Sequence, residues 1–161
     1  MTSQWLQRFH VAQERPGSGF ESALAELRSS GKQGHWIWYV FPQLAGLGAS
    51  SLSREYAIGG LADAVEYLRD PVLRTRLFAV TSTVAQRLRN GASLDDLMGS
   101  RIDALKLVSS LTLFERAARA LEATGDLAEC APLADAAGEV LSAAASQGYP
   151  RCRYTLDRLG L

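Results

Sequence analysis

Helix start and stop signals divide most of this chain into helix-length segments. Asp70-Pro71 combines an N-cap residue with proline at the first helical position, and Asn90-Gly91 ends the segment that it opens. Serine followed by aspartate three positions later opens two more, at Ser93 and Ser100. Since no two strand-like runs are present to pair, the sequence predicts an all-α fold, a single compact multi-helix domain of about seven helices over residues 1–161.

The other expected elements are marked less sharply. Ser18 and Glu21 have capping-box spacing, and Ser53 is expected to cap a short helix. The tail from Arg151 is expected to be exposed. The longer helices are expected over residues 3–13, 18–29, 61–69, 71–89, 100–123 and 132–147, and shorter turns of helix at 36–41, 53–58 and 93–98.

Charge and cysteine spacing argue against several classes of protein. Seventeen basic and seventeen acidic residues give a formal net charge of zero without a block of one sign, so nucleic-acid binding by phosphate neutralisation is not expected. No segment reaches membrane-spanning length, so no membrane association is expected. Cys130 and Cys152 stand far apart, which indicates reduced thiols in a cytoplasmic protein without a metal or other cofactor. The oligomeric state stays open.

Aromatic side chains gather in the segment Gly31–Gly48, GKQGHWIWYVFPQLAGLG. Pro42 ends the short helix expected there, because proline lacks an N–H and restrains the residue before it. Three polar residues, Lys32, His35 and Gln43, bring donors, acceptors and an amine to the same segment. Two interpretations stay open, a core plug and the wall of a ligand pocket. The aromatic residues of the segment are Trp36, Trp38, Tyr39 and Phe41.

Only two of the seventeen basic residues are lysine, Lys32 and Lys106. A desolvated lysine can lose its proton and act as an amine nucleophile, whereas arginine keeps its charge. Two explanations stay open for this skew: a coding bias that favours arginine at indifferent surface positions, and retention of lysine where a guanidinium would not serve. Lys32 lies in the aromatic segment, and Lys106 lies in the longest expected helix.

That helix, expected over residues 100–123, carries the second set of candidate residues. Its apolar residues point in almost every direction, which is typical of a buried helix. Asp103, Lys106 and Ser110 nevertheless share one side of it. This stripe is either a structural ion pair inside the fold or the lining of a cavity. Because the polar side chains of both segments need partners, we expect the two segments to meet and form one composite site.

The motifs together identify a family resemblance. They are Phe9 with Ala12-Gln13, Ala23-Leu24, Glu26-Leu27, Gly31-Lys32, His35-Trp36 with Trp38, Phe41-Pro42-Gln43, Gly46-Leu47-Gly48, Ser53 with Tyr56-Ala57-Ile58, Tyr67-Leu68, Pro71-Val72-Leu73, Asp103 with Lys106-Leu107, and the run from Ser109 to Phe114. In these the chain resembles a bacterial family of small all-helical proteins, the domain of unknown function numbered eighteen-ten, which genomes sometimes mislabel as calpastatin. The resemblance covers nearly the whole chain and implies a fold, not an activity. Gly34 stands where the family pattern has serine.

A looser similarity, at the level of small helical domains with tryptophan-rich pockets, is to the NADAR proteins, which act on N-glycosidic links to ADP-ribose. By this analogy the leading hypothesis is a pocket for a nucleotide-like or ADP-ribose-like small molecule, and as an enzyme the protein would hydrolyse an N-glycosidic bond. The residues expected to be catalytic are Lys32, His35, Asp103 and Lys106. Those expected to bind the ligand are Trp36, Trp38, Tyr39, Gln43, Ser53, Tyr56, Ser109 and Ser110.

The rival hypothesis is a non-catalytic binding or protein-interaction module whose aromatic segment is structural core. Removing the Trp38 ring separates the two. Trp38→Ala should cost about 3–5 kcal/mol of stability if the ring is core, and little if the ring lines an open pocket.

Overall fold

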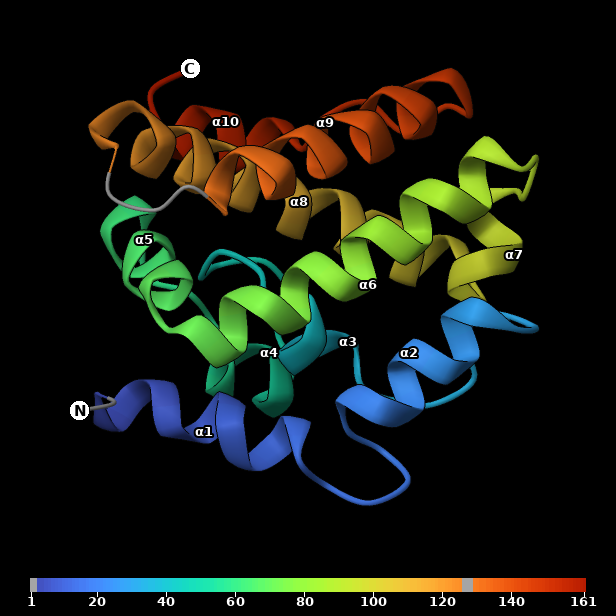
Figure 1. The fold of residues 1–161 in the computed structure, drawn as a ribbon, viewed down its shortest axis with the longest axis horizontal. Helices are drawn as coiled ribbons and strands as arrows, with labels where there is room; N and C mark the ends of the chain where they lie inside the picture. The colour runs from blue at the N-terminus through green and yellow to red at the C-terminus, as the bar shows by residue number, and fades with distance from the viewer. Residues whose placement is uncertain (1–2, 126–128) are drawn as a thin grey trace.

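Ten helices joined by loops account for residues 3–125 and 129–161, the parts of the chain that the computed structural model describes (Figure 1). No strand occurs in these residues, only an isolated parallel bridge between Leu44 and Ile58. The all-α class is confirmed, but the expected number of about seven helices is too low. Four of the ten helices contain only four to six residues. Three of these short helices were expected, and the fourth, at residues 153–158, lies in what was expected to be an exposed tail. The helices are α1 (Gln4–Gln13), α2 (Phe20–Arg28), α3 (Ile37–Val40), α4 (Ser51–Glu55), α5 (Leu61–Arg69), α6 (Pro71–Arg89), α7 (Leu94–Met98), α8 (Arg101–Thr124), α9 (Cys130–Ser146) and α10 (Arg153–Arg158).

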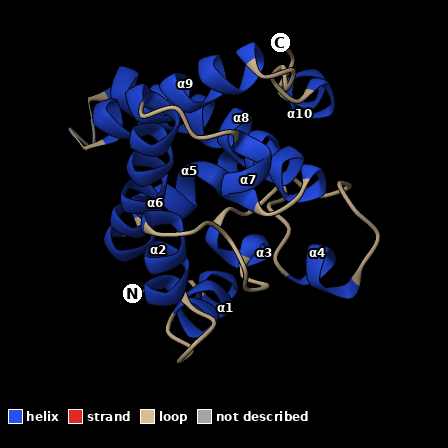
Figure 2. Cartoon of the chain, turned by 90° about the vertical axis from the view of Figure 1, so that its right-hand side faces the viewer, coloured by secondary structure: helices blue, strands red, loops and turns tan. Residues whose placement is uncertain are grey.

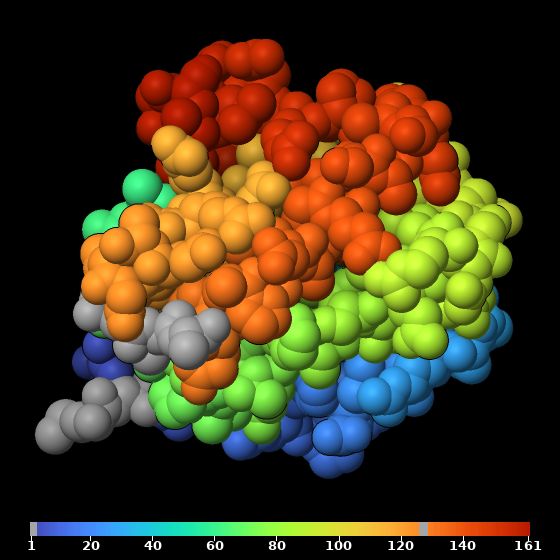
Figure 3. Space-filling view, turned by 45° about the horizontal axis from the view of Figure 1, so that its top comes forward, coloured from blue at the N-terminus to red at the C-terminus, as the bar shows by residue number. Residues whose placement is uncertain are grey.

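The 24-residue helix α8 forms the centre of the fold. It contacts α9 and α5 most extensively, and α7, α10 and α3 pack against it as well. Helix α6 lies between α2 on one side and α9 on the other (Figure 1). Figure 3 shows α9 lying along α6, with the C-terminal residues beyond it. Figure 2 shows α4 and the loop before it at the edge of the molecule.

The first two turns of α8 depart from the sequence prediction. Apolar side chains from Leu107 onward are buried, as expected for a central helix. Ile102 and Leu105 are instead 66% and 46% exposed. The prediction of a helix buried on every side is therefore wrong for this end, because no helix covers these two side chains.

Three helix starts follow the capping signals in the sequence. Asp70 Oδ1 accepts two backbone N–H bonds in the first turn of α6, both at 3.0 Å. The hydroxyl groups of Ser93 and Ser100 each accept the N–H three residues later at 3.1 Å, at the starts of α7 and α8. These caps depend on neighbours in the sequence only, which is why they could be predicted.

Two other predicted caps are wrong. Helix α2 begins after Gly19, and the Ser18 side chain does not cap it. The hydroxyl that caps α4 belongs to Ser50, which accepts the Ser53 N–H at 3.1 Å. Three serines stand within four positions there, so the sequence could not show which one begins the helix.

The C-terminal residues also differ from the expected exposed tail. Arg151 forms a two-bond ion pair with Glu115 of α8, with both N–O distances 3.1 Å. The Tyr154 hydroxyl donates to the Ala45 carbonyl at 2.9 Å, and a Cβ at Gly46 would clash with that hydroxyl. Helix α10 therefore holds the loop between α3 and α4.

Candidate functional site

The two segments with lysine residues meet, as the sequence predicted. Lys32 Nζ lies 2.7 Å from Oδ2 of Asp103, in the first turn of α8. The backbone brings the two together, because the Lys32 N–H donates to the Leu97 carbonyl of α7 at 2.8 Å. Gly99 has φ +83°, and a Cβ there would lie 2.8 Å from the Lys32 carbonyl oxygen. Only glycine fits where this loop crosses the start of α8.

The Lys32 ammonium is engaged inside the protein. Its side chain is 6% exposed. Besides its ion pair with Asp103, Nζ donates to the Gly34 carbonyl at 2.5 Å and lies 5.1 Å from the centre of the Trp36 ring. Of the two interpretations left open, these contacts of Lys32 match the structural ion pair.

Lys106 has a different environment, although it shares the same carboxylate. Its Nζ lies 3.5 Å from Oδ1 of Asp103 and 4.6 Å from the centre of the Trp38 ring. The side chain is 23% exposed and makes no hydrogen bond within the described residues. An ammonium over a tryptophan face is a cation–π contact that leaves its N–H donors open to further partners.

Lys106 and Trp38 stand at the wall of an open cleft of about 420 Å³. Helix α8 forms one side of this lysine–tryptophan cleft, and the α3–α4 loop with α4 forms the other. Lys106 is the only charged side chain among the described residues that line it. The polar lining residues are Gln43, Ser50, Ser53 and Ser109, and the large apolar ones besides Trp38 are Leu47, Ile102 and Leu105.

Two of the serine hydroxyls in the cleft already donate to nearby backbone. Ser109 Oγ donates to the Leu105 carbonyl at 3.0 Å, and Ser53 Oγ donates to the Ser50 carbonyl at 2.8 Å. A hydroxyl that donates in this way keeps acceptor capacity. The cleft therefore combines one cation, one indole face, apolar surface and a few polar groups.

Three aromatic residues expected at the site belong instead to the buried core. Trp36 is fully buried and donates from Nε1 to Glu26 at 3.0 Å. Tyr39 donates its hydroxyl proton to the Ser18 carbonyl at 2.5 Å. Tyr56 packs edge-on against Tyr39, and its hydroxyl accepts a long bond of 3.4 Å from Arg15. Aromatic residues adjacent in sequence thus divide between core and cleft.

Two further expected site residues lie outside the cleft lining. His35 is exposed and makes no hydrogen bond with any other described residue. Ser110 is fully buried, and its hydroxyl has no hydrogen-bond partner in the described residues. Of the four residues expected to be catalytic, only Lys106 lines the cleft.

Glu26 organises the loop that carries Lys32, although no role at the site was expected for this residue. Its Oε1 accepts the backbone N–H groups of Gln33 and Gly34, at 2.7 and 2.9 Å, as well as the indole N–H of Trp36. Desolvation raises the pKa of Glu26, but these hydrogen bonds and the charge of Lys32 outweigh it and lower the pKa below its usual value. The only feature of the sequence that pointed to Glu26 was the Glu26-Leu27 motif of the family resemblance.

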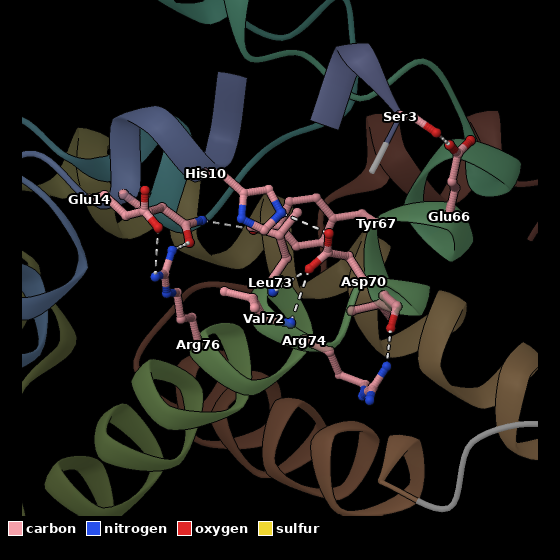
Figure 4. Close-up of polar contacts among 12 residues, drawn as sticks. Ser3, His10, Glu14, Glu66, Tyr67, Asp70, Val72, Leu73, Arg74 and Arg76 are labelled. Atoms are coloured by element: carbon pink, nitrogen blue, oxygen red, sulfur yellow. Dashed lines mark hydrogen bonds and ion pairs between the residues drawn. The ribbon is translucent and has the colours of Figure 1, made fainter. Parts of the chain in front are cut away.

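A second cluster of polar side chains joins α1, α5 and α6, and none of its side chains is a described lining residue of the cleft (Figure 4). His10 Nε2 lies 2.7 Å from Oδ2 of Asp70, whose other oxygen caps α6. Because a carboxylate only accepts, Nε2 of His10 donates this bond. Gln13 donates to the Tyr39 carbonyl at 2.8 Å and to the Tyr67 hydroxyl at 3.1 Å. We call these residues, His10, Gln13, Tyr67 and Asp70, the interhelical network.

The interhelical network is closed to solvent at its centre. Burial raises the pKa of Tyr67, so the phenol keeps its proton as a hydrogen-bonding group. Arg76 donates to Oε1 of Gln13 at 3.3 Å and lies 3.6 Å from Glu14, which completes the polar partners of the Gln13 amide (Figure 4). The network therefore joins the helices through hydrogen bonds that satisfy its buried polar groups.

The described residues thus form an all-helical domain with one lysine and one tryptophan at the wall of a cleft. The chain belongs to the family described as "Protein of unknown function (DUF1810)", which it matches over residues 3–128. It is also similar to the conserved hypothetical protein Rv1873 from Mycobacterium tuberculosis, solved as a crystal structure. The two share 37% identity at a TM-score of 0.74, over 97% of this chain and 96% of that chain. No curated protein matches the chain.

Two general features of the described residues bear on the site. None of the helices there is both long enough and apolar enough to cross a membrane. No group of three His, Cys, Asp or Glu side chains in that part of the chain could hold a metal ion.

Proposed function

We propose that the lysine–tryptophan cleft binds a nucleotide-like small molecule of the ADP-ribose class. The planar base would lie against the apolar wall and the Trp38 ring, and the phosphate groups would accept hydrogen bonds from Lys106. Aromatic side chains stack on every nucleobase, and lysine binds phosphate as a point charge.

The observation that carries this proposal is that the Lys106 ammonium faces the cleft without a hydrogen-bond partner among the described residues. Lys106 is the only charged side chain among the described lining residues, and its ammonium makes no hydrogen bond with them. A cleft whose only charged side chain is an ammonium with unused hydrogen-bond donors favours an anionic ligand. Its volume of about 420 Å³ lies within the range of small-molecule sites.

Binding is the part of the leading hypothesis that these observations support. Hydrolysis of an N-glycosidic bond would need a group to activate water or to protonate the leaving base. The described lining residues include no Asp, Glu or His. We therefore propose a binding function for the cleft and no reaction.

Calorimetric titration with ADP-ribose, ADP and adenosine tests the proposal. ADP-ribose should bind the wild-type protein and raise its melting temperature, since a ligand that prefers the native state stabilises it. Lys106→Gln should weaken ADP-ribose binding about tenfold or more, because a charge-assisted contact is lost. Arg116→Gln is the matched control, since Arg116 is an exposed cation ten residues further along α8.

Two results would contradict this function. One is the absence of any binding by the three nucleotides and nucleosides at millimolar concentration. The other is an equal effect of Lys106→Gln and Arg116→Gln. Either result would favour the rival hypothesis of a non-catalytic interaction module.

A further inference from the structure

Asp103 sits between two lysines that differ in where they can act. One carboxylate oxygen lies 2.7 Å from Lys32 Nζ, and the other lies 3.5 Å from Lys106 Nζ. Lys32 is 6% exposed and does not line the cleft, whereas Lys106 is 23% exposed and does. The carboxylate is therefore bound tightly on the inner side and loosely on the cleft side.

The charges of this array leave an excess on the cleft side. Asp103 carries one negative charge against two lysines, and the shorter distance assigns most of its pairing to Lys32. Glu26, the other carboxylate near Lys32, lies in α2 and accepts three N–H hydrogen bonds from the loop that follows this helix. Neither acid is a described lining residue of the cleft. The Lys106 charge is thus only partly compensated.

We propose that Lys32 is a positioning residue for the cleft. By neutralising Asp103 from inside, Lys32 leaves Lys106 with a net positive charge over Trp38. This charge makes the cleft select anionic over neutral ligands. The inference that this charge selects a ligand rests on the proposed function of the cleft. Without Lys32, Asp103 would turn its full charge to Lys106, and the pair would present almost no net charge to the cleft.

Quenching of Trp38 fluorescence tests the charge at the cleft without any ligand. Iodide is an anionic quencher and acrylamide a neutral one, so the ratio of their quenching constants at fixed ionic strength reports the local potential. A Trp5→Phe background isolates the signal, because Trp36 is fully buried and Trp38 is partly exposed. Phenylalanine keeps the edge-on ring contact that Trp5 makes with Phe9.

In that background, Lys32→Met should lower the iodide-to-acrylamide ratio about twofold, and Lys106→Gln should lower it at least as much. Adding Asp103→Asn to Lys32→Met should restore the ratio, since the uncompensated carboxylate is then gone. Loosening of the loop alone would raise quenching by both agents and leave the ratio unchanged. Arg116→Met should change neither constant.

Titration with ADP-ribose and adenosine then connects the charge to binding. Lys32→Met should weaken ADP-ribose binding about tenfold and leave adenosine binding unchanged, and the double variant with Asp103→Asn should recover ADP-ribose binding to within about threefold. An unchanged quenching ratio in Lys32→Met would overturn the role of Lys32. A lowered ratio in a protein that binds none of these molecules would support that role and overturn the proposed function instead.

Discussion

The lysine–tryptophan cleft and the interhelical network both combine polar side chains with an aromatic ring, and they differ in how many of their polar groups have hydrogen-bond partners. In the network, Asp70 uses both carboxylate oxygens and Gln13 uses both ends of its amide. In the cleft, Lys106 lies over the ring of Trp38 and 3.5 Å from Asp103, and its ammonium makes no hydrogen bond with the described residues. A buried charged group without a partner costs stability, so a charged group with free capacity is expected where solvent or a ligand can reach it. The uncharged Ser110 hydroxyl, buried and unpaired, is an exception among the described polar groups.

The comparison shows that hydrogen-bond saturation separates structural from ligand-binding roles better than residue type does. Lys32 and Lys106 are chemically identical and share Asp103, yet one is closed inside the fold and the other faces the cleft. Trp36 and Trp38, two positions apart, divide in the same way. Each of the following predictions tests that division, from the largest expected effect to the smallest.

The two tryptophans should differ most in stability. Trp36→Ala should cost about 3–5 kcal/mol, because it removes a fully buried ring and leaves a cavity beside Phe41. Trp38→Ala should cost about 1 kcal/mol, since the ring is partly exposed and lines the cleft. Urea unfolding midpoints of the two variants provide the measurement. Equal losses would show that Trp38 is core.

Breaking the interhelical network at Asp70 should have the next largest effect. Asp70→Ala removes a helix cap and the partner of His10, and should cost about 2 kcal/mol or more. Asp70→Asn should cost less, because asparagine also caps helices. Thermal unfolding of both variants, with Asp157→Ala as an exposed acidic control, measures the difference. No difference between alanine and asparagine would mean that the cap contributes nothing.

Glu26 should give a pH-dependent contribution to stability. Its pKa is lowered in the folded protein from an ordinary value of 4.5, so the unfolded state binds more protons at acid pH. The stabilisation is therefore complete above about pH 5 to 6 and is lost as the pH falls through the folded-state pKa. Glu26→Gln should cost about 1 kcal/mol at pH 7, and this difference from wild type should shrink below pH 4.5. A difference independent of pH between 3 and 7 would count against the carboxylate as its source.

Replacing Lys106 by arginine should have the smallest effect on the fold. Lys106→Arg keeps the charge on a partly exposed side chain and should change stability by less than about 0.5 kcal/mol. ADP-ribose binding should nevertheless weaken, because a larger planar guanidinium stacked on the Trp38 ring would cover the face against which the base is proposed to lie. Chemical unfolding and calorimetry on the same sample separate the two effects. Full binding by the arginine variant would mean that only the charge matters.

Local signals in the sequence predicted much of the fold. The starts of α6, α7 and α8 at Asp70, Ser93 and Ser100 could be read from the chain because a cap involves residues within one turn. The meeting of Lys32 with Asp103 could also be predicted, since both stood on apolar segments that could not leave them unpaired.

The sequence could not show which candidate residues are buried in the core and which line the cleft, because this depends on packing between elements that are distant in the chain. Ile102 and Leu105 are apolar like their neighbours in α8, and only the absence of a covering helix leaves them exposed. Trp36 and Trp38 carry the same side chain, and the direction of each depends on where α3 lies against α8. Glu26 gave no local sign of its three hydrogen bonds, whose donors lie seven to ten residues further along.

The bond between Tyr154 and Ala45 has a consequence for synthesis of the chain. The two residues are 109 positions apart, so a ribosome making about 5–20 residues per second needs about 5–20 seconds to pass from one to the other. Throughout that interval the loop that forms one wall of the cleft has no α10 to hold it. A nascent chain would therefore expose Leu47 and Trp38 before the cleft is finished, and ligand recognition would be among the last properties the protein acquires.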